Sequence, residues 1–344
     1  MNVTTVLCCR MTPLQKASIV QLVQIGLAES NHSRGRSSGA PVTAAVGDGG
    51  NDVAMILQAN VGIGIYGKEG REATRAADYA LPQFRFLQRL ILVHGHWSYH
   101  RITSTMLLFY EKCVLFVTVQ ILMNFYAGFT AVSWFESTYY ILYNLAMTGL
   151  MYMTLGIAEK VLTADQLLAH PRLYRHISNQ RNLRLQIILL HVANGMWQGV
   201  VIFFTVYLVL LGTDLYSAAI SRDPVQKTGV DLFDFTLAGA SCYMYTVLVA
   251  NLRLLIYVRD FNLAFGVTIL VTFVLNLTIL LILQVVVPPT DFHHNLYYKL
   301  GQSLCFWVIL PIVVYTALFP ALIWRILSDM WWEKQVQKNS ICAP

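Results

Sequence analysis

The pattern of hydrophobic and polar positions divides the chain near residue 100. Before this point, short apolar runs alternate with polar and glycine-rich stretches. After it, long runs without Asp, Glu, Lys or Arg dominate. Each long run is close to or above the roughly 18–20 residues that a helix needs to cross a bilayer. We therefore predict an all-α polytopic membrane domain over residues 96–330, followed by a tail over 331–344. Its six spans are expected at about residues 102–127, 135–158, 186–211, 235–257, 262–287 and 300–325.

Residues 1–95 have the alternation of strand-like and helix-like segments that is typical of a soluble α/β domain. A helix is predicted over Pro13–Ala28, with Thr12 as its N-cap, and a Ser-, Gly- and Arg-rich loop over Ser30–Pro41. Strands are predicted at Val3–Cys9, Val42–Val46 and Val61–Ile65. Strand–helix alternation favours a parallel sheet. About 95 residues is short for a domain of this kind, so we predict only its C-terminal part.

Composition and charge support a membrane protein and give its orientation. Charged residues make up 12% of the chain and hydrophobic residues 56%, whereas an ordinary soluble domain is about a quarter charged. The net charge of +6 requires no nucleic-acid partner, because basic residues at cytosolic helix ends account for it. Segments 159–184 and 253–260 and the tail after 325 are richer in Lys and Arg than segments 128–136, 214–234 and 291–299. The positive-inside rule therefore places both ends of this chain in the cytosol.

The strongest local motif is GDGGND, from Gly47 to Asp52, which directly follows a predicted strand. Ligands of open α/β sheets bind at the carboxyl ends of the strands. Asp48 and Asp52 would present carboxylate oxygens there, and magnesium is bound by such oxygens together with phosphate oxygens. The alternative is an acidic loop that caps a helix, with Asn51 or Asp48 as the cap. The residues alone leave both interpretations open.

GDGGND, together with Thr12-Pro-Leu-Gln-Lys16-Ala upstream, resembles the signature segments of P-type ATPases. The resemblance implies a haloacid-dehalogenase-like phosphorylation domain that uses ATP as substrate and magnesium as cofactor. It implies that Lys16 faces a phosphorylated aspartate and that Asp48 and Asp52 hold magnesium, while Asn51 and Asp52 support the site. Without the resemblance, a solvated surface lysine would be the favoured interpretation of Lys16.

Further segments are similar to the phospholipid flippases within the P-type ATPases. They are Cys8–Ala17, Val61–Gly70, Ala77–Ala80, Gln83–Leu87, Leu92–Tyr99, Tyr143–Asn144, Gln180–Asn182 and Asn251–Arg253. The resemblance implies ATP-driven movement of phospholipid from the outer to the cytosolic leaflet through an aspartyl-phosphate cycle. It also suggests a small two-span accessory subunit, and a place in the plasma membrane or the Golgi and endosomal membranes. Independently of the resemblance, Glu136 is the only acidic residue between 113 and 158. This segment therefore offers few of the acidic oxygen ligands that a transport site for alkali or calcium ions needs.

Two residues of the predicted membrane domain are candidates for transport. Lys112 is an intramembrane cation and matches the lysine of the flippases' FYKN segment, although Glu111 precedes it and Cys113 replaces the Asn. The alternative is that Glu111 and Lys112 lie near the cytosolic end of the span, where the lysine side chain extends to the membrane interface. Asn144 is a mid-span amide, which is costly unless it is paired. It could instead bridge helices.

The printed sequence lacks the family's DKTGT segment, which carries the phosphorylated aspartate. We therefore expect the chain alone to be inactive as an ATPase. The segment Tyr143–Met151 also lacks the proline of the family's YNxxFTSLP pattern. Two alternatives remain: a truncated, non-catalytic membrane partner or regulator, and a fragment of a cation-transporting P-type ATPase.

Overall fold

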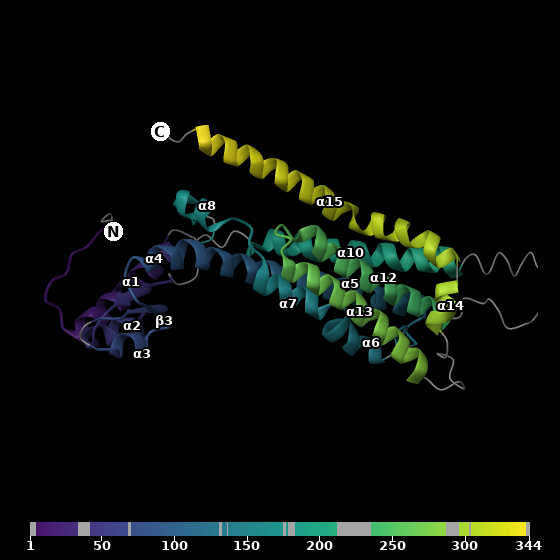
Figure 1. Ribbon diagram of the computed structural model, residues 1–344, viewed down its shortest axis with the longest axis horizontal. Helices are drawn as coiled ribbons and strands as arrows, with labels where there is room; N and C mark the ends of the chain where they lie inside the picture. The colour runs from purple at the N-terminus through teal and green to yellow at the C-terminus, as the bar shows by residue number, and fades with distance from the viewer. Residues whose placement is uncertain are drawn as a thin grey trace, which may run out of the picture. The chain divides into compact units, whose positions relative to one another are not determined.

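The computed structural model describes most of the chain and divides it into two compact units, Met1–Gly95 and His96–Pro344 (Figure 1). The residues described are 5–33, 42–67, 70–130, 133–135, 137–174, 177, 183–211, 235–286, 296–302 and 304–341. Several sequence-based expectations lie outside these residues, among them most of the loop at Ser30–Pro41, Glu136, Gln180–Asn182 and the segment 214–234.

The first unit contains a small parallel sheet between short helices. Its strands are β1 (Ala44–Gly47), β2 (Val61–Ile65) and β3 (Tyr79–Leu81), in the order β1-β2-β3. Both pairings are parallel, with Ala44 opposite Val61 and Ile63 opposite Tyr79. The predicted parallel sheet is therefore confirmed, and β3 is an addition that the sequence pattern did not reveal. The haloacid-dehalogenase-like fold stays a prediction.

Four helices accompany the sheet: α1 (Pro13–Ser33), α2 (Val53–Gln58), α3 (Glu72–Ala76) and α4 (Phe86–Arg89). Thr12 caps α1 as predicted: its Oγ1 accepts from the Gln15 amide at 3.4 Å, and Gln15 Oε1 accepts from the Thr12 amide at 3.0 Å. This reciprocal pair satisfies two donors at the helix start.

The predicted strand at Val3–Cys9 is wrong for residues 5–9, which have no regular structure. Val6 and Leu7 are 75% and 89% exposed. A β-branched and apolar run is extended into a strand only where a neighbouring strand pairs with it and buries one of its faces. Residues 5–9 have no such pairing in the described sheet.

The second unit is a helical bundle. Its elements are α5 (His96–Tyr126), α6 (Ser137–Leu142), α7 (Gly149–Ala158), α8 (Ala164–Ala169), α10 (Leu185–Thr205), α12 (Phe235–Tyr257), α13 (Leu263–Val286), α14 (Leu296–Gln302) and α15 (Leu304–Ile341). Figure 1 shows α5, α7, α10, α12 and α13 gathered together, and α5 packs against both α10 and α7.

Within the described residues, six helical segments are long and apolar enough to cross a membrane, as the sequence predicted. They are Phe86–Tyr126, Ser137–Ala158, Leu185–Leu208, Leu237–Tyr257, Leu263–Ile282 and Phe306–Met330. The last helix, α15, continues to Ile341, so the expected start of a tail at residue 331 lies inside a helix.

The second candidate span is interrupted in its middle. A π-helical turn, Tyr143–Met147, separates α6 from α7, and Thr148 leaves the helical conformation with φ −124° and ψ −26°. Such turns break the regular backbone hydrogen bonding and are frequent at functional sites. This interruption brings Tyr143 and Thr148 against α5, where they form part of the site described below.

Candidate functional site

The GDGGND loop lies where β1 ends. A short 3₁₀ turn, Gly50–Asp52, connects it to α2. The Lys16 ammonium, carried on α1, donates to Oδ1 of Asp52 at 2.7 Å, and the Asp48 amide donates to Oδ2 of Asp52 at 3.2 Å. The structure thus brings together Lys16 and Asp52, which are 36 positions apart in the sequence.

Two glycines permit this close arrangement. A Cβ at Gly47 would overlap the side chain of Asp52, and a Cβ at Gly67 would lie 2.7 Å from the carbonyl oxygen of Asp48. Real Cβ atoms essentially never approach other atoms so closely. Gly47 and Gly67 therefore allow the loop to fold against the neighbouring chain segments.

The carboxylates of the loop differ in their availability to a metal ion. Both oxygens of Asp52 already accept hydrogen bonds, whereas Asp48 is exposed and its carboxylate has no hydrogen-bond partner among the described residues. Asn51 is also exposed. The described residues contain no group of three or more His, Cys, Asp or Glu side chains that could hold a metal ion. Magnesium commonly binds through one or two carboxylates together with waters and phosphate oxygens, and Asp48 fits that pattern better than Asp52.

Lys112 is buried in the membrane unit, with 2% of its surface exposed. Its Nζ donates to Oγ1 of Thr148 at 2.7 Å. The ammonium also lies 4.6 Å from the ring centroid of Phe109, 5.4 Å from that of Tyr143 and 4.6 Å from that of Tyr152. These distances are within the range of cation–π attraction. The alternative in which Lys112 reaches to the interface does not match this buried position.

Glu111, the preceding residue on α5, is 1% exposed and faces different helices. Its Oε1 accepts from Nε of Arg253 at 2.7 Å and from Nε2 of Gln198 at 3.0 Å, and Asn194 also donates to it. Its Oε2 lies 2.6 Å from Nδ1 of His191 and 3.3 Å from Nη2 of Arg253. One carboxylate therefore connects α5 to α10 and α12. We call these five residues the Glu111 cluster.

Sequence reasoning missed the Glu111 cluster. Arg253 was counted among the basic residues of segment 253–260, although the predicted fourth span already extended to residue 257; α12 ends at Tyr257 as predicted and buries Arg253 to 7% exposure. The available signal was one acidic and one basic residue, each inside an apolar run. Charged residues inside membrane helices almost always pair with one another.

Asn144 lies in the π-helical turn and its side chain is exposed in the structure. Among the described residues, no hydrogen bond or ion pair joins it to Lys112; its neighbour Tyr143 provides an aromatic ring 5.4 Å from the ammonium instead. The structure therefore does not bring the two transport candidates together. The roles predicted for Lys16, Asp48, Asn51, Asp52, Lys112 and Asn144 stay predictions.

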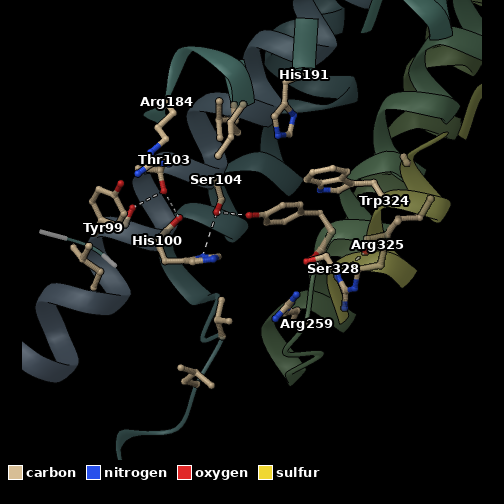
Figure 2. A pocket seen from close by; sticks show the side chains of 18 of the residues that line it. Tyr99, His100, Thr103, Ser104, Arg184, His191, Arg259, Trp324, Arg325 and Ser328 are labelled. Atoms are coloured by element: carbon tan, nitrogen blue, oxygen red, sulfur yellow. Dashed lines mark hydrogen bonds between the residues drawn. The ribbon is translucent and has the colours of Figure 1, made fainter. Parts of the chain in front are cut away.

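A cavity of about 490 Å³ lies within the second unit, between the first half of α5, residues that follow α7 (Val161, Leu162 and Leu173), α10, α12 and α15. Figure 2 shows His100, Arg184, His191, Arg259 and Arg325 around it. Most of the lining is apolar, but its Arg and His side chains are basic and no Asp or Glu is among the lining residues. Arg253 and His191 belong both to this lining and to the Glu111 cluster.

Ion pairs partly offset the positive charge of this cavity. Arg259 and Arg325 both contact Asp329, at 2.8 and 2.7 Å. At the end of α7, Oε1 of Glu159 accepts from the Arg259 amide at 3.0 Å. Burial raises the pKa of Glu159 above its ordinary value of 4.5, because the charged form loses solvation.

Comparisons with known proteins agree on one family. Residues 74–334 match the family described as "Phospholipid-translocating P-type ATPase C-terminal". The chain is 40% identical over 212 residues to phospholipid-transporting ATPase IH of Mus musculus, covering 62% of this chain and 17% of that protein. It is 30% identical over 345 residues to phospholipid-transporting ATPase 11C of Mus musculus, covering 99% of this chain and 28% of that protein. It is 37% identical over 248 residues to phospholipid-transporting ATPase DNF1 of Saccharomyces cerevisiae, covering 72% of this chain and 15% of that protein. The chain spans less than a third of the length of these relatives.

Proposed function

Because the chain belongs to the family of phospholipid-translocating P-type ATPase C-terminal regions, we propose that it works as the C-terminal part of an ATP-driven phospholipid flippase. The complete enzyme would transfer the γ-phosphoryl of ATP to an aspartate and hydrolyse it. It would use that cycle to move phospholipid from the outer to the cytosolic leaflet. The observation that carries this proposal is the buried ammonium of Lys112, which lies among three aromatic rings.

The lipid phosphate is the chemical partner that suits Lys112. Among the described residues, no carboxylate forms an ion pair with this ammonium. A charged group inside a membrane is costly unless it is paired or faces a polar path. A phospholipid phosphate would supply the missing negative charge. Asn144, exposed on the adjacent turn, is a second residue past which a headgroup would move.

In the cytosolic unit, we propose that Lys16 neutralises the phosphoryl group and that Asp48 binds magnesium. When bound, magnesium would stabilise negative charge on phosphate oxygens. Asp52 would orient Lys16 through their 2.7 Å contact and hold the loop through the Asp48 amide. Asn51 would support the same loop. The residue that accepts the phosphoryl group would come from a DKTGT segment, which the printed sequence does not contain.

The setting of the enzyme follows from the same proposal. The phospholipid and the bilayer are its partners, and a small two-span accessory subunit is a further expected partner. We place both ends of this chain in the cytosol, on the plasma membrane or on Golgi and endosomal membranes. The basic segments between the spans support this orientation.

A lipid-uptake experiment tests the proposed function. Sequencing the transcript upstream of Met1 comes first: an in-frame extension that encodes DKTGT supports a flippase, and an in-frame stop supports a non-catalytic partner or regulator. Cells that express the extended protein should take up fluorescent phospholipid faster than cells without it. Lys112→Met should reduce this uptake at least tenfold, while Lys160→Met, which alters a lysine outside the spans, should leave it unchanged. Unchanged uptake with and without the gene would count against a flippase and would favour a cation pump.

A further inference from the structure

Three polar side chains form a stripe along α13, a helix whose other residues are mostly apolar. Thr268, Thr272 and Asn276 recur every four residues, so they lie on one face of the helix. Both ends of the stripe contact the interrupted second span: Oγ1 of Thr268 lies 2.9 Å from Oγ1 of Thr154 on α7, and Nδ2 of Asn276 donates to the carbonyl oxygen of Met147 at 3.5 Å. The stripe therefore follows this span on both sides of its interruption.

The carbonyl oxygen of Met147 is the meeting point of two side-chain amides. Asn251 on α12 donates to it at 3.1 Å, and Asn276 approaches it from α13. The regular hydrogen bonding of the span is interrupted here, because the π-helical turn ends at Met147 and Thr148 leaves the helical conformation. A carbonyl oxygen only accepts hydrogen bonds. Each amide must therefore direct its nitrogen to Met147 and turn its own oxygen away.

Three oxygen atoms around this point have no hydrogen-bond partner in the part of the chain that the structure describes. They are Oδ1 of Asn251, Oδ1 of Asn276 and Oγ1 of Thr272, and each is buried. Thr272 as a whole is only 3% exposed. A buried polar atom without a partner loses its hydration and gains nothing in return. Because the net stability of a folded domain is small, three such atoms in one region need a hydrogen-bond partner.

We propose that these three oxygen atoms bind a buried water molecule, which holds the break in the second span. The hydrogens of a water suit the two amide oxygens, which only accept, and its lone pair suits the Thr272 hydroxyl, which can donate. Three hydrogen bonds are the usual number for a buried water. Ordered water is also one of the means by which a broken membrane helix recovers lost backbone hydrogen bonds. The water site does not depend on lipid transport.

Neutral oxygens also bind alkali-metal ions, but the surroundings of this site favour water. None of the three groups carries a negative charge. The ammonium of Lys112 donates to Oγ1 of Thr148 at 2.7 Å, and Thr148 is the residue after Met147. A metal cation beside Met147 would be repelled by this ammonium, because charges are weakly screened inside a protein. A neutral water molecule avoids this repulsion.

Hydroxyl-radical labelling of the purified 344-residue chain in detergent tests the site. X-ray pulses convert water into hydroxyl radicals, which oxidise the side chains beside it, and mass spectrometry measures the rate for each residue. Met147 is 1% exposed, so bulk water does not reach it. Thr272→Val keeps the shape of the side chain and removes its hydroxyl. This variant should lower the oxidation rate of Met147 at least fivefold, while Thr272→Ser, which keeps the hydroxyl, should retain the wild-type rate.

Thermal unfolding gives a second result, and its sign differs between a hydrated and a dry site. If water bonds to Thr272, Thr272→Val loses one net hydrogen bond and should lower Tm by about 3 °C. If the hydroxyl has no partner, its removal should raise Tm, because a buried polar group is no longer desolvated. The matched control is Thr278→Val: Thr278 is exposed on the same helix, and its hydroxyl donates to the carbonyl oxygen of Val274. Thr278→Val should change Tm by less than about 1 °C.

The elution volume in size-exclusion chromatography checks that each variant is folded. Asn276→Leu removes another partner of the water and repeats the test if Thr272→Val does not fold. Replacing sodium and potassium salts by choline chloride at equal ionic strength should leave both the oxidation of Met147 and Tm unchanged.

Three results would overturn the water site. Equal oxidation of Met147 in the wild type and in Thr272→Val would show that no water lies there. A Tm that stays constant or rises in Thr272→Val would show that its hydroxyl has no partner. A Tm that falls in choline chloride in the wild type, but not in Thr272→Val, would identify a metal cation in place of water. The lipid-uptake experiment with Lys112→Met tests the proposed function separately.

Discussion

The contact between α5 and α10 depends on two glycines, and Gly199→Ala tests how closely these helices must approach. Gly195 and Gly199 are spaced as in the small-xxx-small pattern that allows membrane helices to approach closely. A Cβ at position 199 would lie 2.7 Å from Cβ and 2.9 Å from Cγ2 of Thr118, and 3.0 Å from the carbonyl oxygen of Leu115. Ordinary contacts begin at 3.4 Å. The helices must therefore separate locally by about 0.7 Å.

This separation has a cost that can be estimated. Forcing an extra methyl group into a well-packed interface costs about 1–3 kcal/mol. It also weakens the neighbouring bond from Gln198 to Glu111, which is 3.0 Å long in the native packing. For a unit of about 250 residues, each kcal/mol lowers Tm by about 2–4 °C. We expect Gly199→Ala to lower Tm by about 5 °C.

Thermal unfolding of the purified chain in detergent, followed by tryptophan fluorescence at one fixed scan rate, measures this change. Gly266→Ala is the matched control, because a Cβ at position 266 of α13 meets no atom within 4 Å. Since alanine favours a helix over glycine by about 1 kcal/mol, Gly266→Ala should keep or slightly raise Tm. Equal Tm values for the two variants would refute the close-packing argument. Gly199→Ala also weakens the Glu111 cluster, so its effect overlaps with that of Glu111→Gln. The double variant should therefore lower Tm by less than the sum of the decreases in the two single variants.

Two further predictions concern single side chains. Lys16→Met removes the 2.7 Å contact with Asp52, in which both side chains are partly exposed. The stability loss should therefore stay below about 1 kcal/mol, while hydrogen exchange at the Asp48 amide should quicken; unchanged exchange would contradict a role for this contact in ordering the loop. Glu159→Gln should reduce the dependence of the unfolding free energy on pH. The folded-state pKa of Glu159 is raised above its ordinary value of 4.5, so its charged form is less favourable in the folded than in the unfolded state. The wild type should therefore lose stability as the pH rises above 4.5. Melting curves at pH 5 and pH 8 check this, and equal pH dependence in the two proteins would argue against it.

The sequence predicts the membrane spans well because their signal is length. An apolar run of about 20 residues has few alternatives to a membrane helix, and six such helices are found among the described residues. The strand Val61–Ile65 also matches its predicted bounds. In contrast, Val3–Cys9 has the same apolar character, but residues 5–9 do not form a strand. An apolar run does not show whether a partner strand lies beside it.

The candidate sites were predictable only where a short motif carries them. Lys16 and Asp52 of GDGGND lie 2.7 Å apart in the structure, while the roles that the resemblance to P-type ATPases implies for them stay predictions. The motif did not reveal that Asp52 uses both carboxylate oxygens within the chain. The Glu111 cluster joins residues that are up to 142 positions apart, and no local pattern contains that information.

The Glu111 cluster and the glycines of α10 belong to one physical arrangement. A buried carboxylate is tolerated only if several donors reach it at hydrogen-bond distance. His191, Asn194 and Gln198 can do so because α10 approaches α5 closely; a Cβ at Gly195 would lie 2.6 Å from the carbonyl oxygen of Glu111 itself. Larger residues at Gly195 or Gly199 would withdraw these donors and leave Arg253 as the main partner. The spacing of small residues on one helix therefore determines whether the neighbouring helix can carry a buried charge beside Lys112.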